Sequence, residues 1–373
     1  MKVVAAIDSF KGSMTSMEAG NAVKKGILAA KPDAEVVVKP LADGGEGTVD
    51  ALIEGLGAEK IPVTVAGPLG EKVSCYYGFL EETKTAVMEM ASAAGITLVT
   101  KKDPLRASTY GVGEMIADAL KRGCKNFMIG IGGSATNDGG IGMLKALGFE
   151  FFDEDGNDVG EGAAALAKIE VIRTENKNPL LSGAKFQIAC DVKNPLCGKQ
   201  GATYIFGPQK GVTEEQKSKV DEAMKHYADV TKESLGCDFA DCEGAGAAGG
   251  LGYAFLSYLA GELIPGVELI LQATGLEEKM KNADVVVTGE GRLDAQTVMG
   301  KAPAGVAALA KKYNAKVIAF AGSVAPEAKV CNRAGIDAFF PIVRGVTTLE
   351  EAMKKENAME NIAATAEQVF RLL

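Results

Sequence analysis

The sequence predicts an α/β protein: a Rossmann-like parallel-sheet domain built from both ends of the chain, with a second, mixed α/β domain inserted between them. Short apolar runs alternate with amphipathic helices at the start of the chain, and the last third repeats this alternation. In the middle, three strand patterns follow one another directly. Alternating strands and helices give parallel sheets covered by helices, whereas consecutive strands form meanders. We therefore assign residues 1–70 and 265–373 to the first domain and residues 71–264 to the inserted one.

The N-terminal segment carries strand and helix signals in turn. Residues 3–7 form a short apolar run typical of a buried parallel strand. Thr15 and Glu18 have capping-box spacing, and apolar residues then recur every three or four positions, which predicts a helix with one buried face. Residues 35–39 give a second strand, and a glycine-rich segment after it leads into another helix.

The remaining elements follow from the same patterns of apolar residues and turn residues. In the middle we expect strands at 59–66, 73–80, 85–90, 126–129, 149–152 and 186–191, and a helix at 110–121. In the last third we expect strands at 284–287, 316–321 and 338–343, helices at 302–313 and 326–334, and a final helix begun by Thr348 and Glu351. The small-residue segment 244–252 is interpreted either as a hinge or as a loop beside a ligand.

Composition limits the classes of function. The chain has 373 residues, of which 47% are hydrophobic, and a formal net charge of −9, so nucleic acid is not an expected partner. Its seven cysteines include no C-x-x-C pair, which predicts a reduced protein without a disulfide framework or zinc site. Neither a signal peptide nor a membrane span is expected. We expect a cytoplasmic protein, a monomer or homodimer, that acts on a small molecule.

The single histidine, His226, lies in a charged segment typical of a solvated helix face. A Ser-His-Asp triad, a Cys-His pair and an H-E-x-x-H zinc site are therefore not expected. Any general base is then a carboxylate or a lysine.

Four segments combine glycine with acidic residues, and at least three directly follow a predicted strand. They are residues 42–48, 130–140, 191–198 and 288–294. In open α/β sheets, ligands bind beyond the carboxyl ends of the strands. Glycine exposes backbone N–H groups that hold phosphate, and carboxylates become useful there when Mg²⁺ is bound. A single segment of this kind is ordinarily only a tight turn or a helix cap. Four together favour a site for a metal–nucleotide complex.

A different class of function competes with this one. Residues 130–135 fit G-x-G-x-x-A after a strand, and Asp153 lies about 20 residues further on, as in a dinucleotide-binding fold. The protein would then be an NAD-dependent oxidoreductase of a small hydroxy acid. Against this, Asn137 and Asp138 place an acid where a pyrophosphate should approach. The Walker P-loop pattern is absent from the sequence.

Three basic residues lie in loop motifs: one just after the first strand, one in the segment 206–211 and one in the segment 288–294. They are Lys11, Lys210 and Arg292. Each could hold a carboxylate or a transferring phosphoryl group. For Lys210, a solvated surface side chain is the alternative.

These segments together resemble the bacterial glycerate kinase family, and the likeness runs over nearly the whole chain. The residues that carry it are 8–13, 42–48, 132–140, 190–196, 206–211 and 288–297. The resemblance implies two α/β domains, one inserted in the other, with the site between them. It also implies an ATP-dependent kinase that uses Mg²⁺ and converts glycerate to a phosphoglycerate, with the 2-phosphate favoured over the 3-phosphate.

Phosphoryl transfer needs positioning, charge neutralisation and a group that takes the hydroxyl proton. Asp191 is the candidate for that proton, because it ends a strand and a rigid Asn194-Pro195 pair follows it. Lys11 and Arg292 are candidates to hold the glycerate carboxylate or the γ-phosphate. The candidate Mg²⁺ ligands are Asp43, Asp138 and Asp294, and the candidate phosphate-binding residues are Gly44, Gly45, Gly132, Gly133, Ser134 and Thr136.

Overall fold

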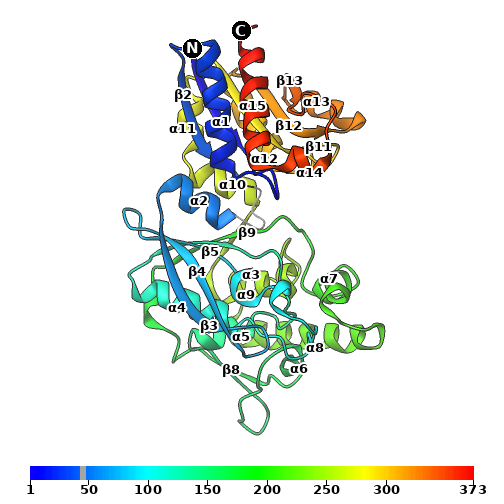
Figure 1. Cartoon of the computed structure of the whole chain (residues 1–373). Helices are drawn as coiled ribbons and strands as arrows, with labels where there is room; N and C mark the ends of the chain where they lie inside the picture. Colours follow the sequence, from blue (N-terminus) through cyan, green and yellow to red (C-terminus); the bar gives the residue numbers. More distant parts are fainter. Residues whose placement is uncertain (43–47) are drawn as a thin grey trace. The chain divides into compact units, whose positions relative to one another are not determined.

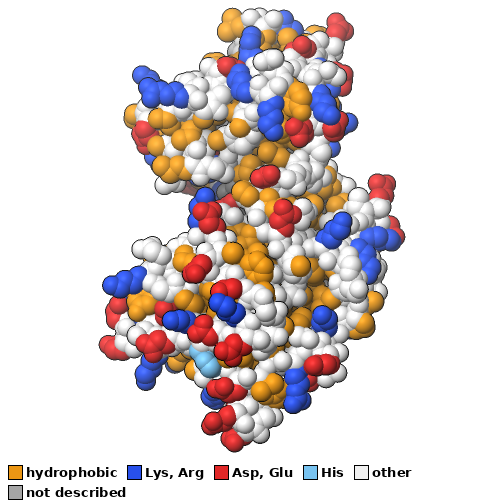
Figure 2. Space-filling model, turned by 180° about the vertical axis from the view of Figure 1, so that it is seen from behind, with side chains coloured by type: hydrophobic (Ala, Val, Ile, Leu, Met, Phe, Trp, Pro, Cys, Tyr) orange, Lys and Arg blue, Asp and Glu red, His pale blue; other side chains and the backbone are white. Residues whose placement is uncertain are grey.

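The structure is a computed structural model that describes residues 1–42 and 48–373. These residues fold into two compact units. The first unit comprises residues 1–42, 50–57 and 266–373, and the second comprises residues 48–49 and 58–265. Among the described residues, none of the helices has the length and apolar character that crossing a membrane requires. On the face shown in Figure 2, acidic and basic side chains are interspersed.

The first unit is built on a sheet of five parallel strands in the order β13-β12-β11-β1-β2. Its strands are β1 (Lys2–Ile7), β2 (Glu35–Pro40), β11 (Val285–Leu293), β12 (Lys316–Val324) and β13 (Ala338–Pro341). In register, Val3 lies between Val36 of β2 and Val285 of β11. Strands from both ends of the chain therefore share one sheet (Figure 1).

Helices cover both faces of this sheet. They are α1 (Ser16–Ala30), α2 (Thr48–Leu56), α10 (Gly266–Ala273), α11 (Leu276–Met280), α12 (Ala302–Lys311), η4 (Pro326–Lys329), α13 (Val330–Arg333), α14 (Leu349–Met353) and α15 (Lys355–Phe370). α1 and α15 lie side by side, and their buried residues Val23, Ile27 and Ile362 share one core with β1 and β11 (Figure 1). α12 contacts β11 and β12 and packs with α10 and α11.

The predicted capping box of α1 is confirmed, since Thr15 and Glu18 each accept from the backbone N–H of the other. The expected final helix is instead two helices, α14 and α15, which are separated by Lys354, whose ψ of 129° is not helical. The Asn357 side-chain amide donates to the Glu351 carbonyl oxygen at 2.8 Å, and the Lys354 backbone amide donates to the same oxygen at 3.3 Å, so both bonds satisfy a carbonyl at the end of α14.

The second unit is built on a mixed six-stranded sheet in the order β10-β9-β6-β5-β4-β3. Its strands are β3 (Glu59–Ala66), β4 (Lys72–Leu80), β5 (Thr85–Glu89), β6 (Asn126–Gly130), β9 (Lys185–Ala189) and β10 (Glu262–Ile264). β3, β4 and β5 form the predicted antiparallel meander, while β5, β6, β9 and β10 are parallel. A separate pair is formed by β7 (Glu150–Phe152) and β8 (Val171–Arg173).

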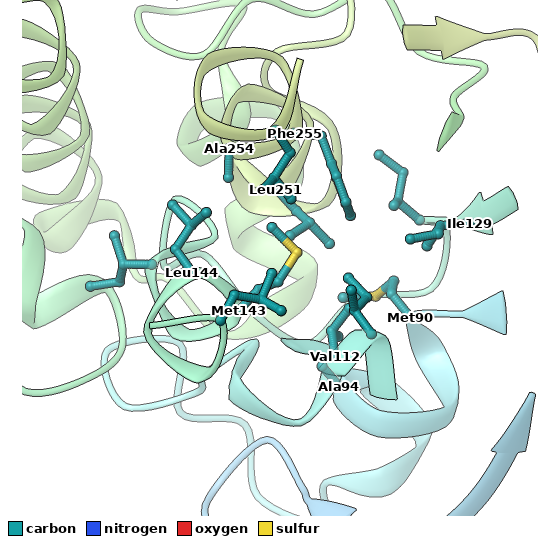
Figure 3. Packing of buried hydrophobic residues seen from close by; sticks show 14 of the residues in the cluster. Met90, Ala94, Val112, Ile129, Met143, Leu144, Leu251, Ala254 and Phe255 are labelled. Atoms are coloured by element: carbon teal, nitrogen blue, oxygen red, sulfur yellow. The ribbon is translucent and has the colours of Figure 1, made fainter. Parts of the chain in front are cut away.

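The helices of the second unit enclose a large apolar core. They are α3 (Ala91–Ala94), η1 (Ile96–Leu98), α4 (Tyr110–Lys121), α5 (Ile141–Ala146), α6 (Ala163–Leu166), η2 (Pro179–Leu181), α7 (Ala202–Lys210), α8 (Glu214–Leu235), η3 (Ala247–Gly249) and α9 (Leu251–Leu259). Figure 3 shows how Met143 of α5, Leu251 of α9 and Val112 of α4 converge beside Met90 and Ile129, which lie at the ends of β5 and β6.

The predicted fold class is confirmed, and two local expectations differ from the structure. β3 was assigned with the first domain but pairs along its whole length with β4 in the second unit. The segment 288–294 was expected to be a loop after a short strand, but β11 continues through it to Leu293, beside β12. Its glycines suggest a loop in isolation, whereas the hydrogen-bonded neighbour β12 keeps the segment extended.

Candidate functional site

The carboxyl ends of four parallel strands meet along one edge of the second unit's sheet. Glu89 of β5 is level with Gly130 of β6, which is level with Ala189 of β9. Ala189 is in turn level with Ile264 of β10. The segments that follow β6 and β9 contain residues 131–140 and Asp191, so this edge gathers most of the site residues predicted for the second unit.

The glycine-rich segment 131–140 starts in an extended course beside residues 94–96. The Ile96 amide donates to the Gly133 carbonyl at 2.8 Å, and the Ala135 amide donates to the Ala94 carbonyl at 2.9 Å. Gly132 and Gly133 are exposed, and Gly133 has a φ of 74°, which favours glycine. No heavy atom lies within 4 Å of the place where a Gly132 Cβ would be. This stretch of backbone is therefore open to a ligand.

Asp138, by contrast, is fully buried beneath this stretch. Its Oδ2 accepts from the Thr109 amide and hydroxyl, both at 2.8 Å, and from the Gly142 amide at 3.3 Å. Its Oδ1 accepts from the Gly140 amide at 3.1 Å. Burial raises the pKa of Asp138, and these hydrogen bonds oppose that rise. Four donors around one buried carboxylate favour a structural role over the predicted Mg²⁺ ligand.

Lys210, at the end of α7, contacts the glycine-rich segment 131–140. It is 2% exposed, so the alternative of a solvated surface side chain is wrong. Its Nζ donates to the Ser134 hydroxyl and to the Thr136 carbonyl, both at 2.6 Å. Burial lowers the pKa of Lys210 to about 7, and the charge of Asp138 opposes this shift.

The small-residue segment 244–252 packs directly against the glycine-rich segment. The Gly139 amide donates to the Gly249 carbonyl at 2.9 Å, and a Cβ on Gly249 would collide with the Thr136 carbonyl oxygen. The need for close backbone approach therefore accounts for the small residues here, and neither a hinge nor direct ligand contact is required to explain them.

Asp191 lies two residues beyond the end of β9, and its side chain is exposed. The backbone on both sides of it is fixed. The Cys190 amide donates to the Ile264 carbonyl at 2.9 Å, and the Asn194 side chain donates to the Gln200 carbonyl at 2.8 Å. An exposed carboxylate on a fixed backbone suits a proton acceptor, although its role stays a prediction.

In the first unit, the loop after β1 lies against the far end of β11. The Asp8 amide donates to the Gly289 carbonyl at 2.9 Å, and a Cβ on Gly291 would lie 4.0 Å from the Lys11 amide nitrogen. Lys11 therefore lies close in space to the strand that carries Arg292. The Arg292 side chain is 67% exposed, and its Nε is 3.6 Å from an Asp294 carboxylate oxygen.

Sequence reasoning missed a buried acidic group in the same strand. The carboxylate of Glu290 accepts from the Thr297 hydroxyl at 2.6 Å, and Lys301 Nζ lies 3.7 Å from its other oxygen. Asp294 Oδ1 accepts from the Gln296 amide at 2.8 Å, which stabilises the turn after β11. Glu290 lies within the glycine-rich segment 288–294, and its position between two glycines was the signal available in the sequence.

The predicted site residues thus fall into two groups. The first unit brings together Lys11, Arg292 and Asp294, and the second unit carries Gly132, Gly133, Ser134, Thr136, Asp138 and Asp191. Asp43, Gly44 and Gly45 lie outside the described residues. In the described part of the chain, no three His, Cys, Asp or Glu side chains form a metal-binding cluster. Since Mg²⁺ bound with phosphates needs only one or two carboxylates, this finding does not decide the metal prediction.

The geometry that a dinucleotide fingerprint requires is not found in the segment proposed for it. Such a fingerprint opens a helix directly after the glycines. Here residues 133–135 instead bond to the segment 94–96, and α5 begins only at Ile141. Asp153 Oδ1 accepts from the amides of Asp155 and Asn157 within a turn after β7. These observations do not support the oxidoreductase alternative.

Comparisons with known proteins lead to a class of kinases. The chain is 45% identical to the glycerate 2-kinase of Escherichia coli (strain K12), over 98% of each chain. It is also 45% identical to the glycerate kinase of Bacillus subtilis (strain 168), over 99% of this chain and 97% of the relative. A crystal structure described as glycerate kinase 2 from Salmonella typhimurium LT2 superposes with a TM-score of 0.91 at 43% identity, and covers 99% of this chain and 97% of that one. Residues 3–373 match the model of the glycerate kinase family, and the chain belongs to that family.

Proposed function

We propose that the protein transfers the γ-phosphate of ATP to D-glycerate, with Mg²⁺ as cofactor, and that the product is 2-phosphoglycerate. The observation that carries this proposal is the near full-length likeness to a relative named glycerate 2-kinase. The open backbone at Gly132 and Gly133, beyond the end of a parallel strand, also supports a phosphate ligand.

In this proposal the 2-hydroxyl oxygen of glycerate attacks the γ-phosphorus as the bond to the bridging β–γ oxygen breaks, and ADP leaves. The hydroxyl proton passes to the Asp191 carboxylate. The amides of Gly132 and Gly133 stabilise negative charge on the phosphates, and Ser134 and Thr136 contribute through the shape of the segment that carries those amides. Such a reaction depends mostly on positioning and electrostatic stabilisation.

The basic residues of the first unit have the complementary task. Lys11 and Arg292 are exposed, and the Lys11 backbone lies beside the strand that carries Arg292, so both are available to a carboxylate or a γ-phosphate. Mg²⁺ would neutralise phosphate charge, and Asp294 remains a proposed ligand because its carboxylate, 19% exposed, lies beside Arg292 in the turn after β11. Asp43 remains a proposal of the same kind.

The test is Mg²⁺-dependent ADP formation with D-glycerate, with a control that lacks glycerate, and with ³¹P NMR to read the position of phosphate on the product. We expect glycerate-dependent ADP release and a 2-phosphate signal. A 3-phosphate signal would correct the regiochemistry and leave the kinase in place. No release above the control, from folded protein, would contradict glycerate as the substrate.

Asp191→Asn tests the proton acceptor, with Asp241→Asn as the matched control because Asp241 is another exposed acid of the same unit. General-base assistance is typically worth about 10²–10⁴-fold, so we expect kcat to fall by about that factor in Asp191→Asn and to stay within about twofold in the control. Turnover of Asp191→Asn within a few-fold of the unaltered protein would remove Asp191 from this role.

A further inference from the structure

Lys210 is a buried lysine that the proposed chemistry does not use. It ends α7 and is followed by Gly211, whose φ of 102° closes the helix. Burying a charged group is unfavourable unless hydrogen bonds and opposite charge compensate for the lost water. A lysine kept in such a place therefore calls for a physical reason.

The contacts of Lys210 all lead to one short segment. Its Nζ donates two hydrogen bonds, one to the Ser134 hydroxyl and one to the Thr136 carbonyl oxygen. The side-chain amide of Asn137, in the same segment, donates to the hydroxyl of Thr203 on α7 at 3.0 Å. Thr203 and Lys210 are seven residues apart, so they lie on one face of the helix, two turns apart. α7 therefore holds this segment at two points.

The held residues adjoin the open backbone directly. Gly132 and Gly133 are exposed, whereas the chain is buried from Ser134 to Gly140. The Thr136 hydroxyl and the Asn137 side-chain oxygen are buried and have no hydrogen-bond partner in the described part of the chain. Removal of Lys210 would leave two more buried oxygens, those of the Ser134 hydroxyl and the Thr136 carbonyl, without a donor. An unsatisfied buried acceptor is unfavourable, so we expect the segment to move when the lysine is lost.

We propose that Lys210 is a positioning residue of the phosphotransfer site: from beneath, it fixes the segment 134–136, and so fixes the amides of Gly132 and Gly133 at the places where they bind phosphate. This inference rests on the proposed function. Lys210 itself does not touch the substrate, because two of its donors are already used within the segment and only 2% of the residue is exposed.

The test is a double-mutant cycle on kcat with Lys210→Met, Ser134→Ala and the pair together, with the exposed Lys199→Met as the matched control. Since a misplacement of about 1 Å can cost about 10²-fold, we expect kcat of Lys210→Met to fall by about that factor, with the KM for D-glycerate changed by less than about threefold. Lys210 acts through Ser134 in this proposal, so the double variant should be no slower than Lys210→Met alone. Losses that multiply, or a fall confined to KM, would overturn the proposal.

A second measurement does not depend on catalysis. Amide hydrogen exchange of residues 132–136, without substrate, should become faster in Lys210→Met and stay unchanged in Lys199→Met. Unchanged exchange in Lys210→Met would overturn the proposal. If Lys210→Met does not fold, Ser134→Ala takes its place in the exchange comparison, because it removes one of the two contacts of Lys210 and keeps the lysine; unchanged exchange in that variant would likewise overturn the proposal. Unaltered protein that lacks glycerate-dependent turnover would contradict the proposed function, and the exchange comparison would still decide whether Lys210 holds this segment.

Discussion

Replacing Asp138 by asparagine separates its structural role from the predicted metal role. The buried carboxylate accepts four hydrogen bonds, three at Oδ2 and one at Oδ1. An asparagine has one oxygen and one NH₂ group, so in either orientation its NH₂ faces at least one N–H donor. The smaller loss occurs when the NH₂ faces Gly140, because the oxygen then keeps the bonds from Thr109 and Gly142.

The magnitude follows from these bonds. A hydrogen bond to a charged group contributes about 1.5–3 kcal/mol and a neutral one about 0.5–1.5 kcal/mol. Asp138→Asn loses one hydrogen bond to a charged group and weakens the other three. The variant also no longer buries a charge, and the free-energy cost of that burial, which raises the pKa of Asp138, partly offsets the loss. We therefore expect the free energy of unfolding to fall by about 2–4 kcal/mol.

The assay is urea unfolding in buffer with EDTA, so that bound Mg²⁺ cannot contribute. Asp155→Asn is the control, because Asp155 is an exposed acid of the same unit, and a change within about 0.5 kcal/mol is expected for it. The structural reasoning would be refuted if Asp138→Asn kept its stability in EDTA while its activity required much more Mg²⁺. That pair of results would restore Asp138 as a metal ligand.

Two further predictions concern stability. In Gly111→Ala, the new Cβ would collide with the Ala66 carbonyl oxygen, so the free energy of unfolding in urea should fall by about 1–3 kcal/mol. Gly132→Ala, whose new Cβ has open space, should change this free energy little, and equal effects in the two variants would contradict the packing argument. The pKa of Lys210 is lowered from 10.5 to about 7, so the unfolded chain binds more protons than the folded one between these values, and stability should rise with pH across that window. Between about pH 7 and pH 9 the gain is about 2 kcal/mol relative to Lys210→Met, and parallel pH profiles of the two proteins would contradict it.

Much of the fold could be predicted because local patterns and tertiary demands agree. The helix expected at 110–121 is α4, and the meander of β3, β4 and β5 is present as expected. Disagreement arose where a neighbouring element decided the conformation. The glycines of segment 288–294 suggest a loop, yet pairing with β12 keeps the chain in β11 up to Leu293. Thr109 precedes α4, yet its side chain bonds to Asp138 and to the Met143 amide and makes no cap bond to its own helix.

The site was predicted only to the level of segments, for a related reason. Sequence spacing located the glycine-rich chain around Gly132, because glycine clusters after strands are visible in the sequence. It could not show that the side chains of Asp138 and Lys210 are buried. That burial depends on the packing of the glycine-rich segment against α7 and against the segment 244–252, which both come much later in the chain. Charged residues are buried rarely enough that an exposed position was the natural expectation for both.

The position of β1 between β2 and β11 in the first unit's sheet has a consequence for the order of events on the ribosome. Lys2 precedes its sheet neighbour Asp284 by 282 residues. At synthesis rates of about 5–20 residues per second, this partner emerges roughly 15–55 s later. Through that interval β1 can pair only with β2, and the N–H and C=O groups along its other edge have no neighbouring strand. The continuous stretch from residue 58 to residue 265, which makes up nearly all of the described second unit, is synthesised before the last strands of the first unit. Until those strands emerge, the open edge of β1 is accessible to chaperones or to other nascent chains.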